Sequence, residues 1–415
     1  MERCDALAHC TEEPGRITRT FCSTAMQEAH ALVRGWMGAA GMSVRVDAAG
    51  NLIGTYEPSG LPTCLSGDSI SPRRVMIGSH LDTVADAGRY DGMLGVLLGI
   101  AVVEALRDAR QTLPWQIEVV GFSEEEGVRF QAPFIGSRAL AGTLDESLLS
   151  RCDAAGVPVR DALGHFGCDS TAVAQCAIAP GSVVAFLEPH IEQGPLLESL
   201  DEPLGVVTAI AGQTRLTIEW VGEGGHAGTA PMELRNDPLP VAGRWIAAVE
   251  ELGRATPGLV ATVGRLTVDP NVPNCIPRRV IASLDVRHQG NGVRIDAMEK
   301  LLAIAEHLAR ESNVRVTVSR QHEHAAVGMD AALTDRLADA LDRLGLPARR
   351  LVSGAGHDAG VIAHVAPTAM LFVRSPGGVS HHPAEAVLPD DVALAIAALV
   401  ELIQDLATRD AKFTA

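Results

Sequence analysis

The sequence predicts an α/β protein in which a mixed sheet has helices on both faces and a smaller α+β domain is inserted into the chain. Three observations lead to this prediction. The chain has 415 residues, more than one ordinary core needs. Short apolar runs that suit buried strands alternate with segments of helical apolar spacing in the outer parts of the chain. The middle of the chain instead alternates apolar and polar residues, which is typical of half-exposed strands.

The larger domain is predicted to comprise residues 1–212 and 329–415. Residues 1–45 are expected to be helical, with the clearest apolar spacing at 25–37, where Gly38 and Gly41 follow. The next expected elements are two strands and a surface loop rich in Pro, Ser and Gly, at 44–46, 52–56 and 57–73.

Four apolar runs in this domain are each followed by acidic or histidine side chains. They lie at 75–77, 116–122, 183–187 and 368–373, and helical spacing recurs at 94–110 and 331–344. In an open sheet with parallel strands, ligands bind outside the carboxyl ends of the strands. The four runs therefore predict one functional site at that edge of the sheet.

The inserted domain is predicted to span residues 213–328, a compact unit of roughly 115 residues. The strand before His381 follows this segment, which is why the domain is interpreted as an insertion. The elements expected in it are four strands and two helices, at 216–220, 260–268, 280–286, 314–318, 238–252 and 293–311.

The composition excludes several classes of protein. A net charge of −17 argues against nucleic acid and anionic membranes as partners. No basic start precedes an apolar core at the N-terminus, and no 18-residue apolar run would span a bilayer. The eight cysteines are scattered without a C-x-x-C pair. The sequence therefore predicts a soluble, cytoplasmic protein with reduced thiols.

The residues after the four strands have the side chains of a metal centre. The expected ligands offer only nitrogen and oxygen donors and are His80, Asp91, Glu126, His190 and His381. This donor set suits two divalent ions sharing Asp91, with Mn or Zn expected and Co or Ni as alternatives. Asp82 is placed to hold the second imidazole nitrogen of His80.

Two assignments stay open at this stage. Within Glu124-Glu125-Glu126, Glu125 is expected to be the general base and Glu126 the ligand, but spacing alone does not fix that register. His382 competes with His381 for the metal. Taken singly, each motif suits a surface pair, a helix start or a loop; it is their recurrence after four strands that favours a metal.

The inserted domain contributes three further candidates. His226 lies in a glycine-rich loop that lets the backbone approach a ligand, and Asn274 lies in a turn between prolines. Arg287 ends a strand and suits a bidentate bond to a carboxylate. A hairpin turn, an Asx-turn and a surface ion pair are the simpler interpretations of these three residues.

Over residues 20–405, the chain resembles the hydantoinase/carbamoylase branch of the peptidase M20 group. The matching motifs are Gly-Ser-His80-Leu-Asp82-Thr, Tyr-Asp91-Gly, Glu-Glu125-Glu126-Gly-Val-Arg-Phe130, Pro-His190-Ile-Glu-Gln193-Gly-Pro, His226-Ala-Gly-Thr, Asn274-Cys-Ile-Pro, Leu-Asp-Val-Arg287, Ser353-Gly-Ala-Gly-His-Asp358-Ala and Ser-His381-His-Pro-Ala-Glu385. The sequence departs from the usual pattern at His382, where relatives often have Asn, and at Gly225, where a polar residue is common.

The resemblance implies roles for individual residues. One metal would bind His80 and His190, the other Glu126 and His381, with Asp91 between them. The inserted domain would be a lid that forms a homodimer, so that His226 enters the partner's active site and stabilises an oxyanion. The residues implied to hold the substrate are Gln193, Asn274 and Arg287, with Arg287 on its carboxylate.

The activity implied is hydrolysis of a ureido or carbamoyl C–N bond on a small carboxylate, with allantoate as the first expected substrate. N-carbamoyl-L-amino acids and N-carbamoyl-β-alanine are the second expectation. Aminopeptidase or N-acyl-amino-acid deacylase activity is the third. The alternative from another class is a non-catalytic binding protein with the same fold, which the intact ligand set and Glu125 disfavour.

Overall fold

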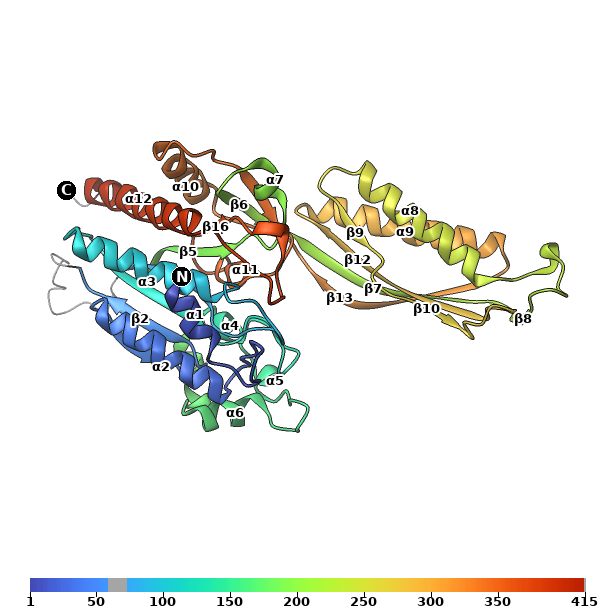
Figure 1. The fold of residues 1–415 in the computed structure, drawn as a ribbon, viewed down its shortest axis with the longest axis horizontal. Coiled ribbons are helices and arrows are strands. Elements are labelled where there is room, and N and C mark those ends of the chain that lie inside the picture. Colours follow the sequence, from blue (N-terminus) through green and yellow to red (C-terminus); the bar gives the residue numbers. More distant parts are fainter. Residues whose placement is uncertain (59–72, 414–415) are drawn as a thin grey trace. The chain divides into compact units, whose positions relative to one another are not determined.

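The computed structural model describes residues 1–58 and 73–413, with side chains through residue 408, so most of the loop predicted at 57–73 lies outside the described residues. The chain divides into two compact units (Figure 1). Unit 1 comprises Met1–Thr208 and Met329–Ala415, and unit 2 comprises Ala209–Gly328. Unit 2 begins before residue 213 because Ala209 and Ile210 pair with a short strand at its other end.

The sheet of unit 1 is mixed, as predicted. Its strand order is β1-β2-β4-β3-β5-β16-β6, with β15 also paired to β6. The strands β4, β3, β5 and β16 run parallel, whereas β2 and β6 are antiparallel to their neighbours. The bounds are β1 Ser43–Val46, β2 Leu52–Tyr56, β3 Arg74–His80, β4 Gln116–Phe122, β5 Val183–Ile191, β6 Leu204–Ile210, β15 Arg350–Ser353 and β16 Thr368–Val373.

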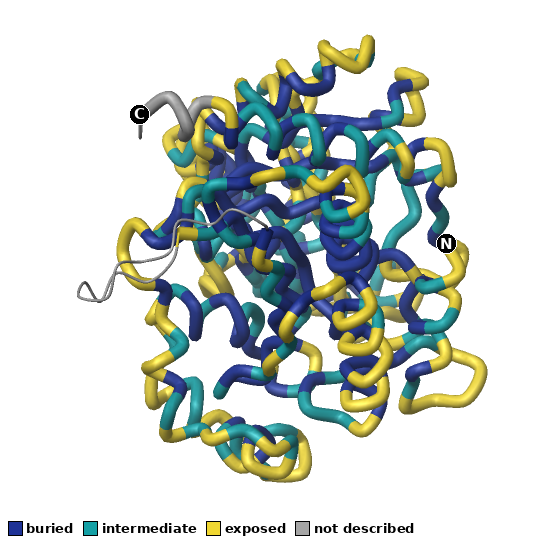
Figure 2. Tube along the Cα trace, turned by 90° about the vertical axis from the view of Figure 1, so that its left-hand side faces the viewer, coloured by how far each residue is buried: buried dark blue, intermediate teal, exposed yellow. Residues whose placement is uncertain are grey.

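Helices flank this sheet. Figure 2 shows buried residues, in dark blue, in the interior and exposed residues, in yellow, mainly at the periphery. Helix α3 lies against β3, β4 and β5 and packs on α12, which in turn packs on α10. Helix α11 contacts β5, β16 and α4. The bounds are α1 Glu2–Ala8, α2 Thr24–Ala39, α3 Met93–Asp108, α4 Ile135–Leu140, α5 Glu146–Leu149, α6 Val159–Phe166, η1 Ser170–Cys176, α7 Leu196–Leu200, α10 Ala331–Arg343, α11 Asp358–Ile362, η3 Pro376–Gly378 and α12 Pro389–Phe413. Among the described residues, no helix is both long enough and apolar enough to cross a bilayer.

The prediction of continuous helix over residues 1–45 was wrong between α1 and α2. Residues 17–19 instead run alongside the loop that follows β3, where the N–H of Ala87 donates to the carbonyl of Ile17 at 2.8 Å. Pro14 and Gly15, which lie between α1 and residues 17–19, oppose helix formation. The hydrogen bonds of the segment therefore go to a distant loop rather than along a helix axis.

Strand β5 extends further than the predicted run at 183–187, because its pairing with β16 continues through Ile191. The strand therefore includes Pro189, although proline cannot donate to a ladder. Its pairing with β3 stops at Leu187, so that edge of β5 is open beyond this point. The extension places His190 within the strand rather than in a following loop.

Unit 2 is a sheet with two helices, as its alternating pattern predicts. The strand order is β10-β12-β7-β13, all antiparallel, with β9 also paired to β12 and β8 paired to β11. Helices α8 and α9 pack on one another over a core that contains Trp220 and Trp245. The bounds are β7 Gly212–Val221, β8 Gly225–His226, η2 Met232–Leu234, α8 Pro238–Ala255, β9 Val260–Thr262, β10 Leu266–Asp269, β11 Cys275–Ile276, β12 Arg279–His288, α9 Asn291–Glu311, β13 Arg315–His324 and β14 Val327–Gly328.

The single strand predicted at 260–268 is two strands in the structure. Between β9 and β10, the hydroxyl of Ser283 accepts a hydrogen bond from the N–H of Arg265 at 3.0 Å. This side-chain contact, next to Gly264, interrupts the ladder to β12. Alternation alone could not show the break.

Candidate metal centre

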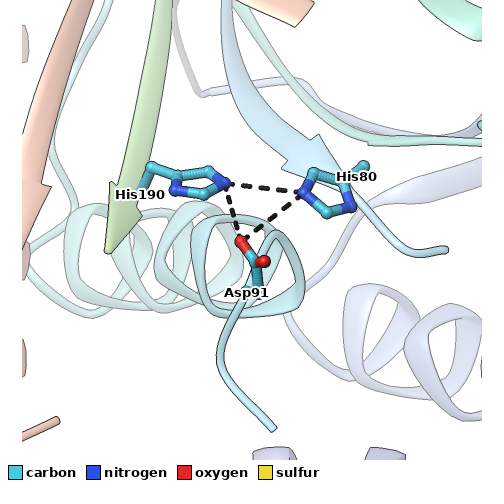
Figure 3. A group of neighbouring side chains, drawn as sticks. All are labelled: His80, Asp91 and His190. Carbon is cyan, nitrogen blue, oxygen red and sulfur yellow. Dashed lines mark hydrogen bonds and ion pairs between the residues drawn. The ribbon is translucent and has the colours of Figure 1, made fainter. Parts of the chain in front are cut away.

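Three side chains from separate elements meet at the carboxyl end of β3 and β5 (Figure 3). His80 is the last residue of β3, His190 belongs to β5, and Asp91 lies just before α3. The Oδ1 atom of Asp91 lies 3.3 Å from Nε2 of His190 and 3.9 Å from Nε2 of His80. The two imidazole Nε2 atoms are 3.5 Å apart. All three side chains are buried, so their donor atoms converge on one enclosed point.

A second group of donors shares Asp91 with the first. The Oδ2 atom of Asp91 lies 3.2 Å from Nε2 of His381, which is 3.6 Å from Oε1 of Glu126. One carboxylate therefore presents one oxygen to each group. Two histidines on one side and an acid with a histidine on the other suit divalent cations, and the shared carboxylate suits a pair of them.

Hydrogen bonds at the far side of two imidazoles orient them for metal binding. Nδ1 of His80 donates to the carbonyl of Asp82 at 3.0 Å, and Nδ1 of His190 donates to the carbonyl of Ile191 at 2.9 Å. Each bond places the proton on Nδ1 and leaves the Nε2 lone pair facing Asp91. This is the usual arrangement behind histidine ligands.

Asp82 lies beside the second imidazole nitrogen of His80 and also has a further role. Its carboxylate Oδ1 lies 3.5 Å from Nδ1 of His80, and its carbonyl oxygen lies 3.0 Å from the same nitrogen. The carboxylate also accepts the backbone N–H groups of Glu125 and Glu126 at 3.0–3.1 Å. Asp82 therefore holds the loop after β4 against the loop after β3.

The three consecutive glutamates point in different directions. Glu126 faces His381 and Asp91, and Glu125 lies with Glu126 in the donor group around His80. Glu124 is fully buried, and neither of its carboxylate oxygens has a hydrogen-bond partner among the described residues. The geometry thus favours Glu126 as ligand and Glu125 as base, because Glu124 points into the protein interior.

The geometry also distinguishes the two adjacent histidines. His381 points its Nε2 at Asp91 and Glu126. Nδ1 of His382 instead accepts the N–H of Ala384 at 3.1 Å, a local bond within its own turn. His381 is therefore the histidine that the structure brings to the donor group.

The site concentrates negative charge in a buried volume. Burial raises the pKa of Glu125 well above its usual value, and the Glu126 carboxylate adds to the rise. Burial also raises the pKa of Glu126 to about 7, with a further contribution from Asp91. For Asp91, burial acts in the same direction, but His381, His190 and His80 outweigh it and lower the pKa. Divalent cations would remove the repulsion among these acids, which fits the donor set.

Three residues that the spacing did not assign to the metal group contact it in the structure. Glu385 Oε1 accepts the backbone N–H groups of Tyr90 and Asp91 at 2.8 and 2.9 Å. Ser380 donates to Asp91 and to Glu385 at 3.3 Å. Gln193, predicted to hold substrate, places Nε2 3.2 Å from both oxygens of Asp91. Ser380 and Glu385 belong to the Ser-His381-His-Pro-Ala-Glu385 motif, so the sequence marks them as part of the site. Sequence spacing does not show which groups they bind.

Unit 2 brings two of its three candidates together. His226 and Cys275 are paired across β8 and β11, and the N–H of Ala227 donates to the carbonyl of Asn274 at 3.0 Å. Arg287 lies at the other end of β12, where its Nε and Nη2 atoms bind the carboxylate of Asp285 at 2.9 and 3.0 Å. Asp285 therefore fixes the direction of the Arg287 guanidinium.

Gly92 allows the turn between Asp91 and α3. Its φ is +67°, and a Cβ atom there would lie 2.3 Å from the His80 ring. We expect Gly92→Ala to displace His80 and weaken divalent-metal binding by about 10- to 100-fold, the usual cost of disturbing a ligand's support. Titration with Mn²⁺ or Zn²⁺ measures this. Gly15→Ala also has a positive φ but open space around it, and it should leave metal affinity unchanged.

The fold and the site define a class: hydrolases of mixed α/β fold with candidate divalent-metal ligands at the carboxyl ends of parallel strands. The model of the family described as Peptidase family M20/M25/M40 matches residues 76–405, and the chain belongs to that family. It is 39% identical to a probable allantoate deiminase of Oryza sativa subsp. japonica, over all of this chain and 89% of the relative. It is 40% identical to an N-carbamoyl-L-amino acid amidohydrolase of Geobacillus stearothermophilus, over 95% of this chain and 94% of the relative. A crystal structure of a hydantoinase/carbamoylase family amidase from Burkholderia multivorans superimposes with a TM-score of 0.90 at 32% identity, covering 98% and 96% of the two chains.

Proposed function

We propose that the protein is a metal-dependent amidohydrolase that cleaves a ureido or carbamoyl C–N bond of a small carboxylate, with allantoate as its substrate. The single observation that carries the proposal is the position of Asp91, whose two oxygens face two separate donor groups beside the buried Glu125. That arrangement provides a cation site with an adjacent base, which hydrolysis of an amide-type bond requires. Relatives named for allantoate and for N-carbamoyl amino acids support the bond type.

Two divalent ions, Mn or Zn with Co or Ni as alternatives, fit the donors described above. When bound, they supply Lewis-acid polarisation of a carbonyl and a lowered pKa for water. His80 and His190 would hold one ion, Glu126 and His381 the other, and Asp91 both. Backbone carbonyls orient the imidazoles of His80 and His190, and Asp82 holds the backbone of Glu126.

The protein's own residues perform the proton transfers. Glu125 takes a proton from the attacking water and returns it to the leaving nitrogen. Burial raises the pKa of Glu125 above that of an ordinary carboxyl group, which makes its carboxylate a stronger base. Asp82 fixes the backbone of Glu125, so the base approaches from one direction. His226 stabilises the developing oxyanion, and Gln193, Asn274 and Arg287 hold the substrate.

N-carbamoyl-L-amino acids are the second candidate substrates, because the relative named for them is as similar as the one named for allantoate, at 40% against 39% identity. Both substrates carry a carboxylate that Arg287 suits. Asp285 would aim Arg287, since it binds the Nε edge of the guanidinium. Both substrates would use the same metal ligands, so the choice between them depends on the residues that line the substrate pocket.

We also propose that the active protein is a homodimer formed through unit 2. His226 and Asn274 lie beyond the Arg279 end of β12, and Arg287 lies eight residues along that strand, about 27 Å away. A small carboxylate cannot touch both ends of that strand within one chain. Met232 and Leu234 beside His226 are each 73% exposed, which supports a partner surface at that end.

A reducing, cytoplasmic location is proposed on the cysteines, because those described are all free and none forms a disulfide.

The test of function is ammonia release by the Mn- or Zn-loaded protein on a substrate panel. The panel contains allantoate, N-carbamoyl-L-amino acids, N-carbamoyl-β-alanine, an N-acetyl amino acid and a dipeptide, with amino-acid release measured for the last two. We expect ammonia from allantoate and its loss after chelation. Ammonia from carbamoyl amino acids alone would replace the substrate and keep the mechanism. Activity on only the dipeptide or the acetyl compound would refute the proposed bond type.

A further inference from the structure

A short N-terminal segment, residues 17–19, runs along the loop that joins His80 to Asp91. The carbonyl of Ile17 accepts the N–H of Ala87 at 2.8 Å, and the hydroxyl of Thr18 accepts the N–H of Asp86 at 3.1 Å. Arg19 and Thr83 form a two-way pair, in which each backbone N–H is bonded to the other residue at 2.9 Å. The loop that carries two of the proposed ligands at its ends is thus aligned by this segment.

Arg19 is the residue of the segment that reaches furthest into the protein. Its side chain is fully buried. Nε donates to the carbonyl of Leu81 at 2.7 Å, between His80 and Asp82. Nη2 lies 3.7 Å from the sulfur of Met93, the first residue of α3 after Asp91. One guanidinium therefore contacts the backbone next to His80 and the helix start next to Asp91.

The same guanidinium anchors the end of α1. Nη1 donates to the carbonyls of Leu7 and Cys10 at 2.9 and 3.0 Å. Burying a cation is costly unless it is hydrogen-bonded and its charge is offset. Three backbone carbonyls accept hydrogen bonds from Arg19, which offsets part of that cost.

We infer that Arg19 is a positioning residue of the metal centre: it fixes the His80–Asp91 loop, in which Asp82 holds the backbone of Glu125 and Glu126. The inference rests on the proposed metal centre and extends it to a segment before residue 76, where the family match begins. Arg19 acts through its hydrogen bonds to Leu81 and Thr83 and is not one of the proposed ligands.

The test is metal binding by Arg19→Met, which keeps an unbranched side chain but removes the donors and the charge. We expect divalent-metal affinity to fall about 10- to 100-fold, the range seen when supports behind ligands are removed. The Co²⁺ d–d spectrum should change with it, because the ligand geometry relaxes. Arg19→Lys keeps the charge but cannot make the forked contacts, and it should lie between wild type and Arg19→Met.

The matched control is Arg3→Met. Arg3 also tethers α1, through an ion pair with Glu104 of α3 at 2.7 Å, but it does not contact the loop. It should bind metal as the wild type does. Wild-type affinity and spectrum in Arg19→Met would overturn the inference, as would an equal loss in Arg3→Met.

If Arg19→Met does not fold, Thr83→Val tests the backbone contact between Arg19 and the loop, because it removes the hydroxyl that accepts the Arg19 N–H. A folded Thr83→Val protein should bind metal more weakly than wild type, and unchanged affinity would overturn the inference. All these measurements use metal rather than substrate. An absence of turnover on every ureido compound would therefore refute the proposed function without deciding the role of Arg19.

Discussion

Replacing Glu125 by glutamine is expected to lower kcat by about 10²- to 10⁴-fold, the contribution of a positioned general base. The amide keeps the size of the side chain and cannot accept the proton from water. Metal content should stay at the wild-type level, because Glu126, and not Glu125, faces Asp91 and His381. KM should change little, since the substrate contacts lie elsewhere. Steady-state kinetics together with metal analysis of the purified variant measure both effects.

The control for this substitution lies on β4, the strand before the loop that carries Glu125. Glu118 in β4 pairs with Arg74 at 2.8 Å and precedes the catalytic loop by several residues. Glu118→Gln should retain nearly all of the activity. If Glu125→Gln turns over at the wild-type rate with its metals bound, the base has been assigned to the wrong residue, or the protein is not a hydrolase.

Mixing two inactive variants is expected to restore activity. His226→Ala should lose about 10²- to 10³-fold in kcat, the usual cost of removing one oxyanion donor. When it is co-expressed with Glu125→Gln, random assortment makes about half the dimers mixed, and each mixed dimer has one site with both residues intact. The mixture should therefore show about a quarter of the wild-type activity, because one site in two works in half the dimers.

The experiment distinguishes a His226 that acts in the partner's site from one that acts in its own chain. If His226 served its own chain, each site in a mixed dimer would lack one residue, and no activity would return. Differently tagged chains allow the mixed species to be purified and assayed alone. As a control, Glu125→Gln mixed with Glu118→Gln should contain active sites only in the Glu118→Gln chains, whichever chain supplies His226.

The sequence predicts the positions of β3 and β4 well. The runs before His80 and Glu126 became β3 and β4 close to the expected positions, because apolar residues flanked by polar turns have few alternatives. The mixed sheet and the family are confirmed. Residue type also shows which side chains can bind a metal ion, so the sequence alone predicts the five candidate ligands.

The supports behind those donors could not be predicted. The carboxylate of Asp82 binds backbone groups 43 and 44 residues away, and Glu385 binds backbone groups nearly 300 residues away. A backbone N–H has no sequence signature, so spacing cannot identify such partners. The same is true of Arg19, whose side-chain acceptors are carbonyl oxygens and a sulfur. Strand boundaries failed for a related reason: β5 continues past Pro189 only because β16 pairs with it.

The insertion of unit 2 has a consequence for biosynthesis. Residues 209–328 are contiguous, so this part can fold as soon as the ribosome has released it. Unit 1 must wait, because β16 lies between β5 and β6 in the sheet and is made after the whole insertion. His381 is the last of the proposed ligands to emerge. Until then one edge of β5 has no partner strand. During synthesis, chaperones and free metal ions therefore encounter a chain whose ligand set is incomplete.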